Sequence, residues 1–215
     1  WEREKERNFA NSPFSMIDTD LYKAKELYPF QVDTVFSILA ELEANGNDFN
    51  LLYQLPTGGG KTVIFSDIAK KYIAKWNKKV LILTHRIELS VQTSKQLSAI
   101  GVNNKVISSE VKNLNDQNDY DCFIAMVETL NNRLNENQNF VEDVGLVIVD
   151  EAHYNSFRKI FQYYNGRNIL GVTATPLSSN KALPLKDHYN KLLVGESISG
   201  LIEKGYLSAA ETYSY

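Results

Sequence analysis

The amino-acid sequence predicts an α/β fold with a mostly parallel central sheet and helices on both faces of that sheet. Three apolar runs of strand length, at residues 51–55, 80–84 and 146–150, lack the alternation of a half-exposed strand. Strands that are buried on both faces of a parallel sheet have this pattern. The segments between the runs have helical apolar spacing, and strands that alternate with helices favour a parallel sheet with right-handed crossovers.

The remaining elements follow from the same patterns. In residues 61–76 the apolar side chains recur every four positions, which predicts a helix. A similar apolar stripe predicts a helix over roughly residues 30–44. Further strands are expected at 104–108, 121–126 and 168–173, and further helices near 87–99, 128–136 and 156–164.

The domain organisation is predicted to be simple. The sequence has no internal repeat, and its asparagine-rich polar stretches are typical of a surface loop and an exposed helix rather than of linkers. We therefore expect one domain over residues 26–207, preceded by an N-terminal helical extension over residues 1–25.

Composition excludes several classes of protein. The chain of 215 residues is 43% hydrophobic and 23% charged, which is ordinary for a soluble globular protein, and no apolar run approaches the length of a membrane span. The charged N-terminus lacks the apolar segment of a signal peptide, and the single cysteine, Cys122, excludes an internal disulfide. These features predict an intracellular, cytoplasmic setting. The three histidines lack zinc-ligand spacing. With a net charge of −3 and a pI of about 5.7, any binding of nucleic acid must be local.

The stretch LPTGGGKT, residues 55–62, lies between the first predicted strand and a helix. In a phosphate-binding loop, glycines let successive N–H groups turn toward an anion, and the N-terminus of the next helix adds its positive dipole end. Lys61 is then expected to reach the β- and γ-phosphates, and the Thr62 hydroxyl to bind Mg²⁺. Leu55 stands where the strict GxxxxGK pattern has glycine. A glycine turn that happens to precede Lys-Thr is the alternative interpretation.

The stretch LVIVDEAH ends a buried strand on two adjacent carboxylates, Asp150 and Glu151. Ligands of open α/β sheets bind at the carboxyl ends of the strands, so the pair should face the same crevice as the glycine loop. Asp150 is then placed to hold Mg²⁺, and Glu151 to orient and polarise the attacking water. An acidic N-cap for the next helix would explain one carboxylate but not the pair.

With these motifs in place, the sequence resembles the superfamily-2 helicases and translocases, specifically the DEAH-type branch that includes restriction-enzyme helicase subunits. The resemblance covers about residues 27–207 and rests on six motifs in the family's order: the adenine-reading segment LYPFQ (27–31), motif I LPTGGGKT (55–62), motif Ia LTHRIELSVQ (83–92), motif Ib MVETL (126–130), motif II VDEAH (149–153) and motif III GVTATP (171–176). It implies a RecA-like P-loop NTPase domain that uses ATP and Mg²⁺.

The resemblance also implies residue roles. Gln31 would read the adenine edge with its amide, and Phe30 or Tyr28 would cover the base. His153 would accept hydrogen bonds from motif III and couple the γ-phosphate to the nucleic-acid face. The GVTAT strand is expected between the strands that carry the glycine loop and the carboxylate pair. The implied nucleotide-binding set is Gln31, Thr57, Gly58, Gly59, Gly60, Lys61 and Thr62; catalysis falls to Glu151, Lys61 and Asp150, the metal to Thr62 and Asp150, and coupling to His153, Thr173 and Thr175.

Nucleic acid would be bound at two strand-to-helix junctions, where helix N-termini and hydroxyls suit a phosphodiester backbone and position it without reading sequence. The residues implied are Thr84, His85, Arg86, Glu128 and Thr129. DNA is favoured over RNA by the branch that the sequence resembles.

The family's motor has two RecA-like lobes, and nothing after motif III resembles the arginine motif of the second lobe. We therefore expect residues 1–215 to be the first lobe of a longer protein, with residues 208–215 beginning a linker. Two other classes remain open: a P-loop phosphotransferase, and a non-catalytic module that senses nucleotide. The former leaves motifs Ia and III unexplained, and the latter has no need for an intact Lys61, Thr62, Asp150 and Glu151.

Overall fold

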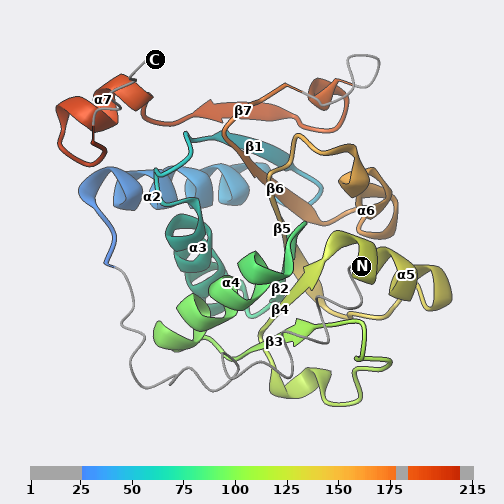
Figure 1. The fold of residues 1–215 in the computed structure, drawn as a ribbon. Helices are drawn as coiled ribbons and strands as arrows, with labels where there is room; N and C mark the ends of the chain where they lie inside the picture. Colours follow the sequence, from blue (N-terminus) through green and yellow to red (C-terminus); the bar gives the residue numbers. More distant parts are fainter. Residues whose placement is uncertain (1–25, 178–183, 209–215) are drawn as a thin grey trace, which may run out of the picture.

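The computed structural model describes residues 26–177 and 184–208 (Figure 1). The N-terminal extension expected over residues 1–25, and the linker expected from residue 208 except for its first residue, lie outside the described residues.

The described residues form a seven-stranded sheet in the order β3-β4-β2-β5-β6-β1-β7, and every strand pair is parallel. The predicted parallel α/β fold is therefore confirmed. The strands are β1 (Asn50–Gln54), β2 (Lys79–Thr84), β3 (Asn104–Ile107), β4 (Cys122–Met126), β5 (Val144–Asp150), β6 (Asn168–Thr173) and β7 (Lys191–Val194).

Helices cover both faces of the sheet (Figure 1). One face packs against α2, α3 and α4, and the other packs against α5 and α6. The helices are α2 (Pro29–Asn45), α3 (Lys61–Trp76), α4 (Ile87–Ala99), α5 (Val127–Glu136), α6 (Arg158–Tyr163) and α7 (Ile198–Glu203). No helix in the described ranges is both long and apolar enough to cross a membrane.

The central strands bury side chains on both faces, which is why their sequences show no polar alternation. Along β2, Val80 and Ile82 belong to the core under α2, α3 and α4, whereas Leu81 and Leu83 belong to the core under α5 and α6. Successive side chains of a strand point to opposite faces. All four side chains are fully buried, so the continuous apolar run reflects two cores rather than one.

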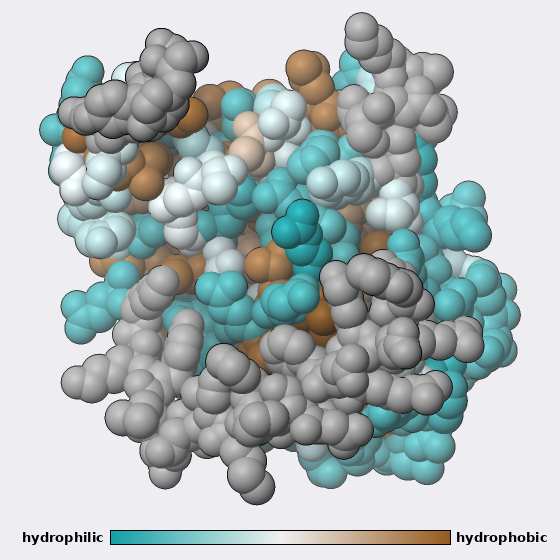
Figure 2. All heavy atoms as spheres, in the orientation of Figure 1, coloured by the Kyte–Doolittle hydropathy of each residue, from teal (hydrophilic) through white to brown (hydrophobic). Residues whose placement is uncertain are grey.

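β7 and α7 were not predicted. β7 has four residues, lies at the edge of the sheet and pairs with β1 alone. Leu192, Val194 and Ile198 are exposed there, and hydrophobic spheres lie over this region in the upper part of Figure 2. Four residues on a half-exposed edge carry too little periodicity to be recognised from sequence.

The order of the strands brings the motifs together. β6 lies between β1 and β5, and Val172 on β6 is in register with both Tyr53 on β1 and Asp150 on β5. The predicted position of the GVTAT strand is therefore confirmed. Because all three strands run in the same direction, the glycine loop, the carboxylate pair and motif III all lie where the carboxyl ends of these strands leave the sheet.

Candidate functional site

The glycine loop joins β1 to α3 and is the first part of the site. Gly58 and Gly60 have φ angles of +86° and +82°, in a region that residues other than glycine rarely enter. Gly59 is required for a different reason: a Cβ there would lie 2.7 Å from the Cγ of Leu55. Leu55 is fully buried. It therefore acts as a packing residue beneath the loop, which accounts for a leucine where the strict motif has glycine.

The loop offers backbone donors at the start of α3. The amides of Gly58, Gly60, Lys61 and Thr62 donate no hydrogen bond to any described residue. The first N–H groups of a helix have no partner within it, and together with the helix dipole they favour an anion. Thr57 and Gly58 are exposed, while Lys61 and Thr62 are partly buried.

Gln31 fastens α2 to this loop. Its Nε2 donates to the carbonyl oxygen of Gly59 at 3.0 Å, and its Oε1 accepts from the backbone N–H of Tyr28 at 2.8 Å. The side chain is only 3% exposed. Gln31 thus ties the start of α2 to the loop, and one Nε2 hydrogen and one Oε1 lone pair remain for the adenine contact implied by the family.

An aromatic cluster lies at the start of α2. The ring of Tyr206 lies 4.7 Å from that of Tyr28 and 5.0 Å from that of Phe30. Tyr28 remains half exposed. Both residues expected to cover a base therefore lie beside Gln31, and Tyr206 joins them from the segment after α7, an addition that sequence spacing alone does not reveal.

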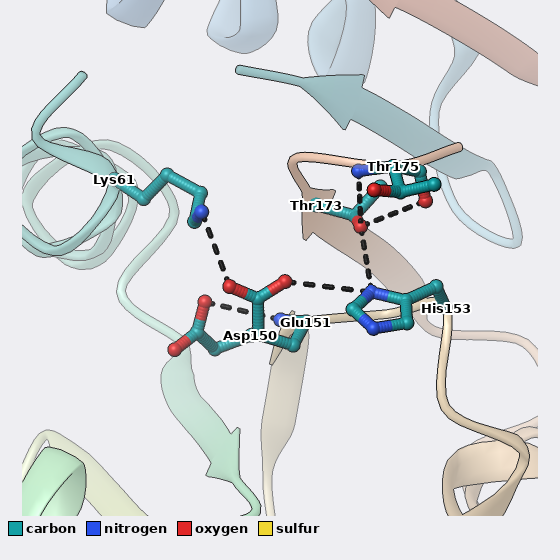
Figure 3. A network of polar contacts seen from close by, with 6 residues as sticks. All are labelled: Lys61, Asp150, Glu151, His153, Thr173 and Thr175. Carbon is teal, nitrogen blue, oxygen red and sulfur yellow. Dashed lines mark hydrogen bonds and ion pairs between the residues drawn. The ribbon is translucent and has the colours of Figure 1, made fainter. Parts of the chain in front are cut away.

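The two carboxylates point in different directions at the end of β5 (Figure 3). Glu151 has a φ of +53°, a left-handed conformation that is uncommon for a side chain of this size. Its Oε1 lies 3.1 Å from the Nζ of Lys61, and its Oε2 lies 3.4 Å from the Nδ1 of His153. The turn thus places the Glu151 carboxylate between Lys61 of the glycine loop and His153 of motif II.

Asp150 is 5% exposed, and its Oδ1 accepts a hydrogen bond of 3.0 Å from the Glu151 N–H. Burial, followed by the nearby charge of Glu151, raises the pKa of Asp150 to about 6, whereas Lys61 acts in the opposite direction. A buried carboxylate with a raised pKa gains from a cation that would share its charge. The described residues contain no group of three or more His, Cys, Asp or Glu side chains placed to bind a metal, so a cation here would need further oxygen ligands such as Thr62 and phosphates.

Motif III meets motif II through hydrogen bonds. The Nδ1 of His153 lies 2.9 Å from the Oγ1 of Thr173, and that hydroxyl also donates to the carbonyl oxygen of Thr175 at 3.0 Å. The Thr175 N–H donates back to the same hydroxyl at 3.1 Å. Figure 3 shows the continuous connection from Lys61 through Glu151 and His153 to this pair of threonines.

Thr84, which was predicted to contact nucleic acid, is instead buried at the junction between β2 and α4. Thr84 is fully buried, and its hydroxyl donates to the carbonyl oxygen of Arg86 at 3.1 Å and lies 2.7 Å from the hydroxyl of Ser90. Its side chain has no surface to offer a phosphodiester, so it shapes the junction instead. Arg86 is exposed and His85 is partly buried.

The second predicted junction lies between β4 and α5. Glu128 and Thr129 occupy the first turn of α5; Glu128 is exposed and Thr129 is partly buried. Their contact with nucleic acid remains a prediction.

Tyr154 was missed by sequence reasoning. Its ring centroid lies 4.6 Å from that of His85 and 4.2 Å from that of His153. The contact joins the end of β2 to the residues that follow β5. No motif marks Tyr154, because the residue after VDEAH carries no spacing signal of its own.

The polar groups at this end of the sheet fit a nucleoside triphosphate with Mg²⁺: loop amides that donate to no described residue, a lysine, a hydroxyl and a buried carboxylate. There is no room for a Cβ at Gly60, where it would lie 2.3 Å from the Nε2 of Gln31. Fold and site together define the N-terminal RecA-like domain of a superfamily-2 helicase, a nucleic-acid motor class that depends on ATP.

Comparison with known families places the chain more narrowly. Residues 24–178 match the family described as "Type III restriction enzyme, res subunit". The match covers more than half of the chain, and the chain belongs to this family.

Two curated relatives are helicases by name. The chain is 30% identical over 205 residues to "Putative ATP-dependent helicase IRC3" of Saccharomyces cerevisiae, a match covering 88% of this chain and 29% of that protein. It is 27% identical over 163 residues to "ATP-dependent DNA helicase Hel308" of Pyrococcus abyssi, covering 70% of this chain and 22% of that protein. The chain thus spans less than a third of the length of either relative.

Solved structures support the fold. The type ISP restriction-modification enzyme LlaGI, in a complex with a DNA substrate mimic, superimposes with a TM-score of 0.64 at 18% identity, covering 85% of this chain and 21% of that one. The UvsW helicase of bacteriophage T4 superimposes with a TM-score of 0.61 at 19% identity, covering 88% of this chain and 67% of that one.

Proposed function

We propose that this chain is the ATP-binding lobe of an ATP-hydrolysing motor that acts on nucleic acid, with DNA as the preferred substrate. One observation carries the proposal: the polar connection from Lys61 through Glu151 and His153 to Thr173, with contacts of 3.1, 3.4 and 2.9 Å. A domain that only held a nucleotide would need the loop but not this connection to motif III.

The roles proposed within the nucleotide site are those that the family resemblance implies. The amides of Gly58 and Gly60 and the Lys61 ammonium would hold the phosphates, while Gln31 would contact the adenine edge. Thr62 and Asp150 would hold Mg²⁺, which, when bound, neutralises charge that develops on the phosphates. Glu151 would orient and polarise the attacking water, since its carboxylate is held by partners on two sides.

The nucleic-acid face would be formed by His85, Arg86, Glu128 and Thr129. These residues lie at strand-to-helix junctions of β2 and β4, which end at the same edge of the sheet as β1 and β5. Contacts to phosphate fix position without reading bases, which suits a motor that must act on any sequence. A few local contacts are compatible with a net charge of −3.

Hydrolysis would require a second RecA-like lobe, as the family resemblance implies. An arginine finger supplied by such a lobe typically contributes about 10³–10⁵ in turnover. We therefore expect the 215-residue chain to bind Mg-ATP modestly and to hydrolyse it very slowly. A two-lobe protein, meaning one in which this chain is followed by a second motor lobe, should hydrolyse ATP in response to nucleic acid.

The test compares ATP hydrolysis by the two-lobe protein with single-stranded DNA, duplex DNA and RNA. The proposal expects DNA to stimulate turnover and expects the 215-residue chain to show almost none. Strong nucleic-acid-stimulated turnover by the chain alone would contradict the need for a second lobe. Turnover that no nucleic acid stimulates would favour a phosphotransferase, and the absence of saturable Mg-ATP binding would overturn the nucleotide site itself.

A further inference from the structure

Tyr154 makes the only ring contacts that join the predicted nucleic-acid junction to the DEAH residues within the described part of the chain. Its ring lies 4.6 Å from His85 at an interplanar angle of 48° and 4.2 Å from His153 at 35°. The side chain is 40% exposed. Tyr154 therefore lies at the surface and contacts two imidazole rings.

His85 packs on Tyr154, its one ring contact among the described residues. Its Nδ1 is buried and makes no hydrogen bond to any described residue. Burial lowers the pKa of His85, and the positive charge of Arg86 lowers it further. Because its Nδ1 has no hydrogen bond within the described part of the chain to fix the ring, packing against Tyr154 contributes to the orientation of the ring. Arg86, the next residue, is exposed and available to a phosphodiester.

On its other side Tyr154 touches the catalytic turn twice. Its ring packs on His153, whose Nδ1 contacts both Thr173 and Glu151. Its backbone N–H also donates to the carbonyl oxygen of Glu151 at 3.2 Å. Tyr154 therefore contacts the backbone of Glu151 directly, and it contacts the Glu151 carboxylate through the His153 ring.

We propose that Tyr154 is a positioning residue that transmits phosphodiester contact at His85 and Arg86 to His153 and Glu151. The proposal rests on the function proposed above. Contact of a nucleic-acid strand with Arg86 would move the His85 ring. Tyr154 would transmit that movement to Glu151, the residue proposed to orient the attacking water. A chain of packed side chains is a physical route for coupling, and its members must show energetic coupling to one another.

The first experiment measures ATP hydrolysis by the two-lobe protein with and without saturating single-stranded DNA. Tyr154→Leu should lower the stimulation of kcat by DNA roughly tenfold, while the KM for ATP stays within about twofold, because the lost interaction acts after ATP has bound. Tyr154→Phe keeps the ring and should retain stimulation within about twofold of the wild type. Stimulation that Tyr154→Leu leaves unchanged would overturn the proposal, as would an equal loss in Tyr154→Phe.

Tyr163→Leu is the matched control. Tyr163 is a partly buried tyrosine at the end of α6, and its hydroxyl donates to Asn135 at 2.6 Å, away from the site. The same substitution there removes an equal ring and should leave DNA stimulation unchanged. A loss as large as that of Tyr154→Leu would show that the effect is one of general stability, against the proposal.

A double-mutant cycle tests whether His85 and Tyr154 act together. If they lie on one route, His85→Ala combined with Tyr154→Leu should reduce stimulation no further than the more damaging single substitution. Effects that multiply would show independent action and would contradict the route.

A spectroscopic measurement on the 215-residue chain separates this proposal from the proposed function. His85→Ala should shift the imidazole resonances of His153 in the NMR spectrum, and the same substitution in the Tyr154→Leu background should shift them much less. An equal shift in both backgrounds overturns the role of Tyr154 even if DNA stimulates turnover. If the His153 shifts differ as expected but nucleic acid does not stimulate ATP hydrolysis, the role of Tyr154 in joining the two histidines stands and the proposed motor function is overturned.

Discussion

Lys61 and Glu151 form an ion pair of 3.1 Å that joins the first residue of α3 to the residue after β5. The exposed fraction of the two side chains is 11% and 22%, so the pair is partly shielded from water. The other carboxylate oxygen of Glu151 lies 3.4 Å from His153. The Nζ of Lys61, which would hold phosphates, is therefore paired with the carboxylate that would act on water.

Glu151→Gln should stop turnover while preserving ATP binding. Glutamine has nearly the same size and can still accept hydrogen bonds, but it cannot act as a base, and general acid–base catalysis contributes about 10²–10⁴ in rate. A fall of that order is expected in single-turnover phosphate release by the two-lobe protein, with an unchanged dissociation constant for a fluorescent ATP analogue. Glu110→Gln, on the exposed loop after β3, is the control. Unchanged turnover in Glu151→Gln would refute the role.

Lys61→Ala should instead weaken binding itself. The substitution removes a charged donor to phosphate, and such hydrogen bonds contribute roughly 1.5–3 kcal/mol each, which corresponds to about a ten- to hundredfold loss of Mg-ATP affinity. Titration calorimetry on the chain would measure it. Lys70→Ala, an exposed lysine on the same helix, should bind as the wild type does. Equal affinities for Lys61→Ala and wild type would remove Lys61 from the phosphate site.

Gly60→Ala and Gly101→Ala form a matched pair. Both glycines have nearly the same φ, +82° and +81°, but a Cβ on Gly60 would lie 2.3 Å from the Nε2 of Gln31, whereas one on Gly101 would meet nothing within 4 Å. Both variants pay the cost of a left-handed alanine, roughly 1 kcal/mol. Only Gly60→Ala also displaces Gln31 from the Gly59 carbonyl, which costs roughly 1 kcal/mol more.

Chemical denaturation of the chain would measure this difference. Gly60→Ala should also lower the affinity for ATP, because Gln31 no longer holds the loop against α2, and Gly101→Ala should not. Equal unfolding free energies and equal ATP affinities for the two variants would show that the Gln31 contact contributes nothing.

The stability of the metal-free chain should depend on pH through Asp150. Burial raises its pKa from 3.8 to about 6, so the protonated form is favoured in the folded state. Between pH 3.8 and about 6, Asp150 is ionised in the unfolded chain but still protonated in the folded chain, so the free energy of unfolding falls as the pH rises. Above about pH 6 the carboxyl group is ionised in both states, and the free energy of unfolding falls no further. Asp150→Asn removes this loss of stability. It should raise the free energy of unfolding at pH 7.5 by roughly 1–3 kcal/mol and change it little below pH 4.

Denaturant titrations at several pH values with a chelator present would test this dependence. Asp33→Asn, an exposed carboxylate on α2, should show no comparable gain. A pH-independent effect of Asp150→Asn would mean that burial does not govern this carboxyl group.

Prediction from sequence succeeded where one physical rule acts locally. The runs of β2 and β5 are apolar at every central position because both sheet faces are covered, and the stripe of α3 recurs every four residues because one face packs on the sheet. The glycine loop was located because its run of glycines favours a tight turn, and the carboxylate pair because it directly follows a buried apolar strand. β7 could not be predicted, because an edge strand of four residues owes its structure to pairing with β1.

Sequence reasoning also assigned Thr84 to the nucleic-acid face, whereas folding buried its hydroxyl against Arg86 and Ser90. Burial of a side chain at a junction depends on how the following helix packs, and no local pattern reports it. The same limit concealed the contact of Tyr154 with His85 and the contacts of Tyr206 with Tyr28 and Phe30, which join residues far apart in the chain.

By itself the sequence determined the class of fold, the phosphate loop and the residue types of the site, because backbone preference and hydrophobic periodicity act over a few neighbouring residues. Tertiary structure decided which of these residues meet: Glu151 with Lys61 and His153, Gln31 with Gly59, and Tyr154 with His85. Those pairings depend on the parallel order β5-β6-β1 and on the packing of helices over it, which are set by the whole core rather than by any segment.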